Sequence, residues 1–250
     1  MPGKYLYCIT EAEALPQAEI TGVGGKNLER ICFNDLACIV SEATYEGPPP
    51  FPMDRESLMA HERVNEAVMQ GGTVLPVRFG TVAPTTEALT EQALKPRYEE
   101  IRALLQDMRG KTEFGVRALW TDMPAIYREI TEEERRIRTL RDVLRKRASY
   151  QGQIQLGELV QAALEGKRHQ EAERLTSTLR GMACSWKDLE LWGDQMMVLS
   201  AALLIRRDQE RALDEEVNRL VDQHRTRLRF RYLGPTPPHN FVQLLIHFTP

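Results

Sequence analysis

A long, charged helical pattern in the middle of the chain restricts the fold more than any other feature, because it separates two segments of short strand patterns. From about residue 124 to residue 146, apolar residues recur at helical spacing. They are Ile126, Ile130, Ile137, Leu140 and Leu144. Residues 149–152 interrupt this pattern, and a second helical pattern runs to about Met182. Two amphipathic helices joined by a short break predict an antiparallel helical hairpin.

The first 120 residues alternate between strand patterns and two helices. We expect strands over residues 4–10, 28–33, 36–41, 74–79 and 112–119. Asp54 is suited to cap a helix over residues 55–70, and a second helix over residues 86–108 is interrupted near Pro96. Between them, Gly47–Pro52 is proline-rich and predicts an extended loop. Antiparallel strands covered by helices predict a ferredoxin-like N-terminal domain over residues 1–120.

The remaining residues, 121–250, combine the helical hairpin with a small sheet. Residues 196–205 are apolar on both faces, as in a central strand, although their length also permits a helix. We then expect a helix over 208–224, a strand over 227–232, a rigid turn over 234–238 and a closing strand over 240–248. The predicted fold class is therefore α+β with two domains. The C-terminal domain consists of the hairpin plus a small α/β sheet unit.

The composition is typical of a globular cytoplasmic protein. With 33 basic and 36 acidic residues, the net charge is -3, which supplies no general attraction to nucleic acid. No apolar run reaches the roughly 18 to 20 residues that cross a bilayer, and the N-terminus lacks the zones of a signal peptide. Cys8, Cys32 and Cys38 lie among strand-type residues and Cys184 lies beside a helix, so we expect small buried side chains in a reducing compartment. The absence of a Cys-x-x-Cys pair argues against a zinc site.

Two motifs suggest chemistry, and both are incomplete. Gly22–Lys26 resembles a phosphate-binding loop, but Asn27 replaces the required Ser or Thr, and a strand pattern follows instead of a helix. His61 and Glu62 begin like a zinc-protease helix, but Asn65 stands where the second histidine ligand is needed. We therefore expect no metal, no cofactor and no enzymatic activity. A catalytic site assembled from residues distant in sequence stays open.

Two segments suggest binding surfaces. Arg227, Arg229 and Arg231 share one face of a regular strand, which is either a solvated or internally paired face or a platform for an acidic partner or RNA. The aromatic residues that an RNA-binding sheet exposes fall on the opposite face, which disfavours RNA. The second segment, residues 75–81, contains Arg78, Phe79 and Gly80. It reads either as an edge strand that ends in a turn or as an edge that accepts a partner strand.

Five segments in order along the chain resemble the GvpL/GvpF family of gas vesicle proteins. They are residues 5–9 (YLYCI), His61-Glu62, residues 75–81 (LPVRFGT), residues 110–116 (GKTEFGV) and residues 234–242 (GPTPPHNFV). Two positions depart from the family pattern. Cys8 stands where glycine is common, and Thr236 stands where tryptophan is common, so an aromatic contact from position 236 is in doubt.

The resemblance implies a two-domain, non-enzymatic accessory protein of gas vesicle assembly, located in the cytoplasm and at the gas vesicle. Its expected partner is the main gas vesicle shell protein (GvpA-type), with other accessory proteins as further partners and neither nucleic acid nor a lipid membrane among them. Such a shell protein carries a large apolar face that aggregates unless it is covered. The partner-binding residues we expect are Arg78, Phe79, Gly80, Arg227, Arg229, Arg231, Pro235, Pro237 and Pro238. The alternative is an RNA-binding ferredoxin-like module that uses the basic strand face.

Overall fold

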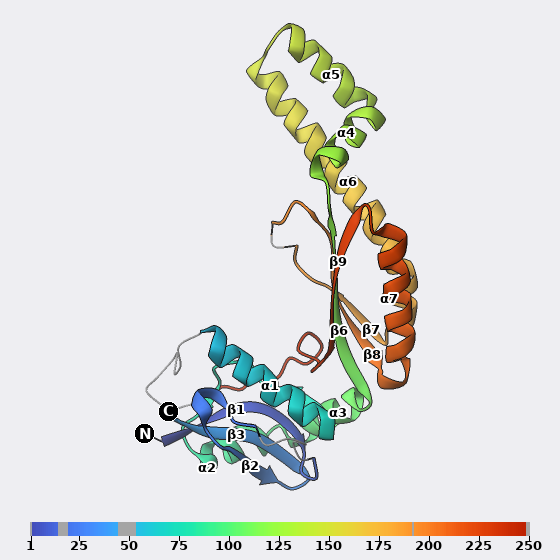
Figure 1. The fold of residues 1–250 in the computed structure, drawn as a ribbon. Helices are drawn as coiled ribbons and strands as arrows, with labels where there is room; N and C mark the ends of the chain where they lie inside the picture. Colours follow the sequence, from blue (N-terminus) through green and yellow to red (C-terminus); the bar gives the residue numbers. More distant parts are fainter. Residues whose placement is uncertain (1, 15–19, 45–53, 192, 249–250) are drawn as a thin grey trace. The chain divides into compact units, whose positions relative to one another are not determined.

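The computed structural model describes residues 2–14, 20–44, 54–191 and 193–248, which form two compact units (Figure 1). Unit 1 comprises residues 1–113 together with 234–250, and unit 2 comprises residues 114–233. The sequence-based division at residue 120 assigned residues 234–250 to the second domain, whereas they group with unit 1. Whether the two parts are independent domains stays a prediction.

Unit 1 contains an antiparallel sheet with the strand order β2-β3-β1-β4. Its strands are β1 (Pro2–Glu11), β2 (Leu28–Phe33), β3 (Leu36–Thr44), β4 (Val74–Pro76) and β5 (Val82–Ala83), and β5 also pairs with β1. The β2–β3 hairpin turns at Asn34, whose φ of 53° is one that asparagine tolerates. A hairpin beside β1, with a helical crossover to β4 on the other side of β1, confirms the ferredoxin-like plan.

Helices and turns complete unit 1. They are η1 (Val23–Gly25), α1 (Arg55–Gly71), α2 (Thr86–Ala88), the π-helical turn η2 (Leu89–Leu94) and α3 (Tyr98–Met108). Asp54 caps α1 as expected, because its side chain accepts a hydrogen bond of 2.7 Å from the Ser57 N–H. Val64 and Val68 of α1 pack on Tyr5, Tyr7 and Ile39 of the sheet, so the core lies between α1 and the first strands.

Unit 2 contains most of a four-stranded sheet with the order β7-β8-β6-β9. The elements are β6 (Lys111–Trp120), α4 (Met123–Glu133), α5 (Arg135–Lys146), α6 (Tyr150–Met182), β7 (Ser185–Asp188), β8 (Met197–Arg206), η3 (Arg207–Gln209), α7 (Glu210–His224) and β9 (Leu228–Thr236). The predicted hairpin is present, since α4 and α5 lie against the long helix α6 (Figure 1). Leu175 of α6 and Leu213 of α7 share one core with Val198 of β8.

Several local predictions differ from the structure. The apolar segment near residue 200 is a strand, and β7 was not predicted because its sequence is short and mostly polar. The closing strand over residues 240–248 is wrong, because no described residue after Thr236 is in a strand. Val242 and Leu244 are nevertheless buried, so the alternation reflects burial without ladder hydrogen bonds. The turn expected at residue 234 begins later, since β9 continues through Thr236.

Cys8 and Cys38 are buried as expected, whereas Cys32 and Cys184 are exposed. The proline-rich segment Gly47–Pro52 lies outside the described residues, so the extended loop stays a prediction.

Candidate partner-binding site

His61 of α1 lies at the centre of a buried hydrogen-bond network in unit 1. Its side chain is only 1% exposed. Its Nε2 atom lies 3.1 Å from the carbonyl oxygen of Val77, and its Nδ1 atom lies 3.0 Å from the hydroxyl of Tyr5. The Tyr5 hydroxyl in turn accepts a 3.2 Å hydrogen bond from the Gly80 N–H. Three segments that are distant in sequence therefore meet at one imidazole.

The partners of His61 determine where its proton resides. A carbonyl oxygen can only accept, so Nε2 carries the proton and donates it to Val77. In the neutral ring, Nδ1 is then an acceptor, and the Tyr5 hydroxyl donates to it. Burial disfavours the charged form and lowers the pKa of His61 to about 4. At neutral pH the imidazole ring is thus uncharged, and its hydrogen bonds fix its position beside the segment Val77–Gly80.

The His61 side chain supports a loop at residues 78–80, which lies between the short strands β4 and β5. On one side of the loop, the Val77 N–H donates to the Tyr7 carbonyl at 2.9 Å. On the other side, the Leu6 N–H donates to the Thr81 carbonyl at 3.0 Å. Gly80 adopts a φ of +82°, which glycine tolerates without a steric penalty. The strand expected over residues 74–79 therefore stops at Pro76, and Arg78 projects as an exposed side chain.

Phe79 is half-buried against the imidazole. Its ring centroid lies 5.5 Å from that of His61 in an edge-to-face arrangement, and Tyr7 stacks on His61 at 5.5 Å. Tyr5 contacts the same ring edge-on at 5.7 Å. Aromatic packing of this kind fixes ring orientations, so Phe79 is presented at the surface in one position.

The segment after β9 adds an ionisable pair beside the network. Nε2 of His239 lies 2.8 Å from a carboxylate oxygen of Glu62, the residue after His61. Burial alone would lower the pKa of His239, but the contact with Glu62 outweighs burial and raises it. Conversely, burial would raise the pKa of Glu62, and the contact with His239 lowers it. The pair favours a protonated His239 beside an ionised Glu62.

Glu113 fixes the segment after β9 through hydrogen bonds. Its buried carboxylate accepts a 2.8 Å hydrogen bond from the Asn240 N–H and a second one from the Asn240 side-chain amide. Thr236 donates from its hydroxyl to the Glu113 carbonyl at 3.1 Å. Each of the five sequence segments that suggested a family therefore contributes residues to unit 1.

Three of these segments line an open groove of about 390 Å³. Its lining includes His61, Glu62, Val77, Arg78, Phe79, His239, Val242 and Leu244. The large exposed apolar side chains among the described residues of unit 1 are Leu58, Met59 and Leu245, and Leu245 also lines the groove. Leu58 lies one helical turn before Glu62 on the same face of α1. We name the groove together with Leu58 and Met59 the Phe79 groove; it combines an apolar rim with one ionisable pair.

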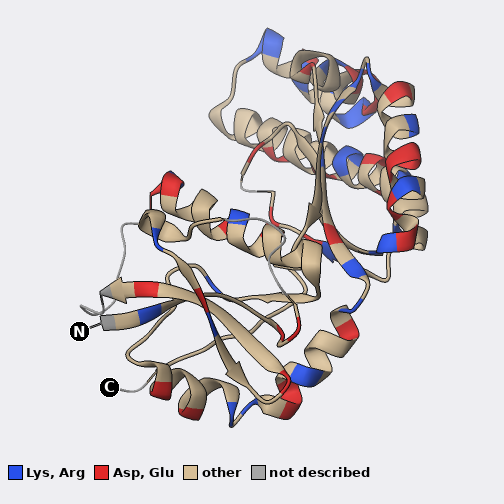
Figure 2. Cartoon of the chain, turned by 60° about the horizontal axis from the view of Figure 1, so that its bottom comes forward, with Lys and Arg blue, Asp and Glu red and all other residues tan. Residues whose placement is uncertain are grey.

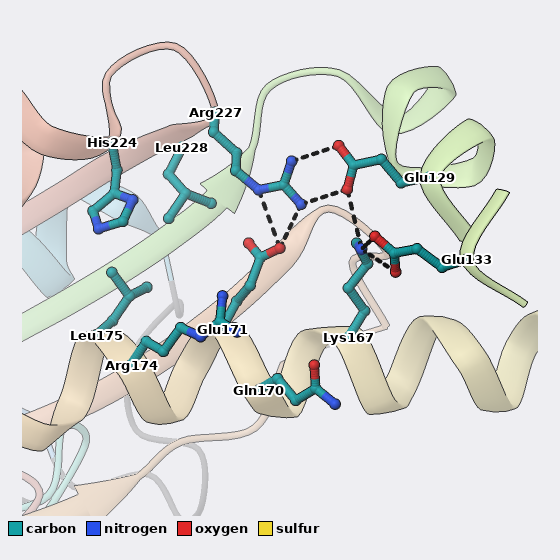
Figure 3. A pocket seen from close by; sticks show the side chains of 10 residues that line it. All are labelled: Glu129, Glu133, Lys167, Gln170, Glu171, Arg174, Leu175, His224, Arg227 and Leu228. Carbon is teal, nitrogen blue, oxygen red and sulfur yellow. Dashed lines mark hydrogen bonds and ion pairs between the residues drawn. The ribbon is translucent and has the colours of Figure 1, made fainter. Parts of the chain in front are cut away.

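Arg227 lies in unit 2, where an ion-pair network engages it (Figure 3). Its guanidinium donates to both carboxylate oxygens of Glu129, at 2.7 and 2.9 Å, and to Glu171 at 3.1 Å. Lys167 bridges Glu129 and Glu133 at 3.1 and 2.8 Å. A cavity of about 380 Å³ adjoins these groups, but three carboxylates face Arg227, Lys167 and Arg174, so it carries no net charge for a ligand. The network ties α4 and α6 to the start of β9.

The other predicted residues lie apart from this network. Arg229 and Arg231 are exposed, while Phe230 and Tyr232 are half-buried against the core of unit 2, as the alternation predicted. An aromatic platform for RNA is therefore missing beside the two arginines. Pro235 is exposed at the end of β9, whereas Pro237 and Pro238 are buried just before His239. Of the nine predicted residues, Arg78, Phe79 and Gly80 lie together.

Sequence reasoning treated His61 and Glu62 as an incomplete zinc motif, and it missed that Tyr5, His61, Glu62 and His239 lie in one site. The available signal was their presence in the five segments of the resemblance. The incomplete phosphate loop forms the short turn η1, whose Val23 N–H donates to Tyr7. Across the part of the chain that the structure describes, no three His, Cys, Asp or Glu side chains gather as metal ligands. No described helix has the length and apolar character to cross a bilayer.

The chain is similar to known proteins over nearly its whole length. The chain matches the family described as gas vesicle synthesis protein GvpL/GvpF over residues 3–243. It is 27% identical to gas vesicle protein F of Dolichospermum flosaquae, over 96% of this chain and 97% of that protein. Its fold is similar to the crystal structure of GvpF from Anabaena sp. PCC7120, with a TM-score of 0.87, 25% identity, and coverage of 98% of this chain and 100% of that one.

GvpF from Microcystis aeruginosa gives a TM-score of 0.81 at 27% identity, over 97% of this chain and 99% of that one. The similarity thus extends over both units and includes every segment that meets at the Phe79 groove. The match over nearly the whole sequence and the shared fold lead to one conclusion: this chain belongs to the GvpL/GvpF family of gas vesicle synthesis proteins.

Proposed function

We propose that this chain is a non-enzymatic accessory protein of gas vesicle assembly, which acts in the cytoplasm and at the vesicle by binding the main shell protein. The observation that carries the proposal is the Phe79 groove, which three of the five family-like segments line beside exposed apolar side chains. Tyr5 and Glu113, from the other two segments, hydrogen-bond to His61 and Asn240. Membership in the GvpL/GvpF family supports the gas vesicle role.

The groove suits a partner that is largely apolar. A shell protein that lines a gas space carries an apolar face, which is an aggregation hazard until assembly. Phe79, Leu245 and Leu58 offer it an apolar rim, and Arg78 offers one exposed cation at the same edge. Since Tyr5 and His61 hold the loop rigidly, little conformational entropy is lost on binding.

Co-expression with the shell protein, followed by affinity capture, tests the proposal. We expect capture of the shell protein by the parent chain and weaker capture by Arg78→Ala and by a Phe79→Ser/Leu245→Ser double variant. Leu233→Ser is the matched control, because Leu233 is an exposed leucine of unit 2 at 69% exposure. The control should capture as much shell protein as the parent.

Absence of a complex, together with normal vesicles after deletion of the gene, contradicts the proposal. Equal capture by the parent and the groove variants would show that the shell protein binds another surface of the chain. Washing purified vesicles stringently separates two forms of the role: retention of the chain marks a built-in minor component, and loss marks a transient assembly factor.

A further inference from the structure

The end of the helical hairpin in unit 2 carries a dense cluster of cations. We define the hairpin tip as residues 135–154, which comprise α5, the connection to α6 and the first turns of α6. Residues 135–147 include seven Lys or Arg residues and one acidic residue, Asp142, in a chain whose net charge is -3. Figure 2 draws Lys and Arg in blue and Asp and Glu in red.

Most of these cations lack an acidic partner. Arg141 pairs with Asp142 at 3.1 Å, and Arg138 donates to the backbone carbonyl of Glu132 at 2.9 Å. Among the residues that the structure describes, no carboxylate lies within ion-pair distance of the other five. These five exposed residues are Arg135, Arg136, Arg145, Lys146 and Arg147. Their contrast with the paired Arg227 shows that the tip is a distinct electrostatic surface.

The hairpin tip also carries three exposed apolar side chains. Val143 is 55% exposed, Tyr150 is 82% exposed and Ile154 is 46% exposed. Tyr150 and Ile154 are four residues apart on α6, so they share one face. They lie outside the hairpin's own core, which Ile137 enters at 3% exposure. Gly152 lies in close contact with Leu144, because a Cβ atom there would meet Leu144 at 2.6 Å, so α5 and α6 are already packed together.

We propose that the hairpin tip docks an acidic amphipathic helix of another protein. The cations select carboxylates through charge complementarity. The apolar trio requires an apolar counterpart, which a nucleic acid backbone lacks. A membrane-bound helix would insert its main apolar face, but α5 turns that face toward α6. This surface uses none of the residues of the Phe79 groove, so the inference stands independently of the proposed function.

A synthetic helical peptide with glutamates on one face and leucines on the other is the probe. Its affinity for the full chain is measured by fluorescence anisotropy. A scrambled peptide of the same composition and a peptide with lysines in place of glutamates are the peptide controls. We expect only the acidic amphipathic peptide to bind, with an affinity that falls about tenfold between low and moderate salt, because exposed charges are screened.

Two variants locate the binding site, and both alter exposed residues so that the fold is retained. We expect Arg145→Gln/Lys146→Gln/Arg147→Gln to weaken binding about tenfold and to flatten the salt dependence. Tyr150→Ala/Ile154→Ala should weaken binding severalfold without changing the salt dependence. Arg206→Gln/Arg211→Gln removes two other exposed cations of unit 2 and should bind like the parent.

Any of four outcomes would overturn the inference. Three concern the peptides and variants: the acidic peptide does not bind, the scrambled peptide binds equally well, or the tip variants bind like the parent. The fourth is that single-stranded RNA, anionic vesicles or a second copy of the chain binds the tip in preference to the peptide, which competition and light-scattering measurements would detect.

Discussion

The hydroxyl of Tyr5 and Nδ1 of His61 lie 3.0 Å apart in the interior of unit 1. Because His61 donates from Nε2 to the Val77 carbonyl, the tyrosine must be the donor in this pair. The Gly80 N–H completes the chain of hydrogen bonds at the tyrosine oxygen. One hydroxyl thus links the first strand, the first helix and the loop that carries Arg78 and Phe79.

Replacing Tyr5 with phenylalanine should destabilise the protein by about 1–3 kcal/mol, because the imidazole Nδ1 and the Gly80 N–H lose a buried partner. Urea unfolding of the parent and variant measures the difference. Tyr150→Phe is the control, since Tyr150 is 82% exposed, and its stability should equal that of the parent. Equal stability of Tyr5→Phe and the parent would show that the network contributes nothing to folding.

The buried His61 should make stability fall with acidity. Its folded-state pKa of about 4 lies below the value of 6.5 for an exposed histidine. As pH falls from 6.5 towards 4, the unfolded chain therefore binds a proton that the folded chain does not. Across this window, His61 should lower the free energy of unfolding by at most about 1.4 kcal/mol for each pH unit of acidification. The pH series of His61→Gln, compared with that of the parent, should lack this contribution.

His239 should behave in the opposite way, because contact with Glu62 raises its pKa. The stability from this pair is fully present below the unfolded value of 6.5 and is lost as pH rises through the folded pKa. In Glu62→Gln, NMR titration of the His239 ring should give a lower pKa than in the parent. Glu66→Gln should lower it less, because Glu66 makes a smaller contribution. A His239 pKa that is unchanged in Glu62→Gln would contradict the pairing.

Arg227→Ala should destabilise unit 2 by about 1–3 kcal/mol, because Glu129 and Glu171 lose their shared guanidinium. Arg227→Lys should restore part of the loss, since a lysine ammonium cannot pair bidentately with Glu129. Thermal unfolding gives both values. Arg229→Ala is the control, because Arg229 is exposed and makes no ion pair with any residue that the structure describes. If Arg229→Ala lost as much stability as Arg227→Ala, the loss would not result from the ion-pair network.

Much of the fold followed from local patterns. Asp54 predicts the start of α1, and the alternation of Leu228, Phe230 and Tyr232 predicts which face of β9 is inward. Both signals act within a few residues, so sequence alone carries them. The same alternation at Val242 and Leu244 wrongly predicted a strand. Alternation indicates which side chains are buried, whereas a strand also needs a neighbouring backbone to pair with.

The site followed only in part. Arg78, Phe79 and Gly80 are consecutive, so one segment revealed them, whereas Glu62 and His239 are 177 residues apart and meet only through the tertiary fold. Arg227 illustrates the same limit. The sequence left open whether the arginine strand is solvated, internally paired or a binding platform, and Glu129 and Glu171, distant in sequence, pair with Arg227. Pairing partners of this kind cannot be assigned from one sequence, because spacing does not constrain them.

Unit 1 draws its residues from both ends of the polypeptide. His239 reaches Glu62, and Asn240 reaches Glu113, only after residues 114–233 have been synthesised. A nascent chain on the ribosome therefore cannot complete the Phe79 groove until residues 239–245 have emerged, whereas unit 2 is continuous and can form earlier. The order of synthesis thus delays the groove until unit 2 has been made, and a product terminated within unit 2 would lack it.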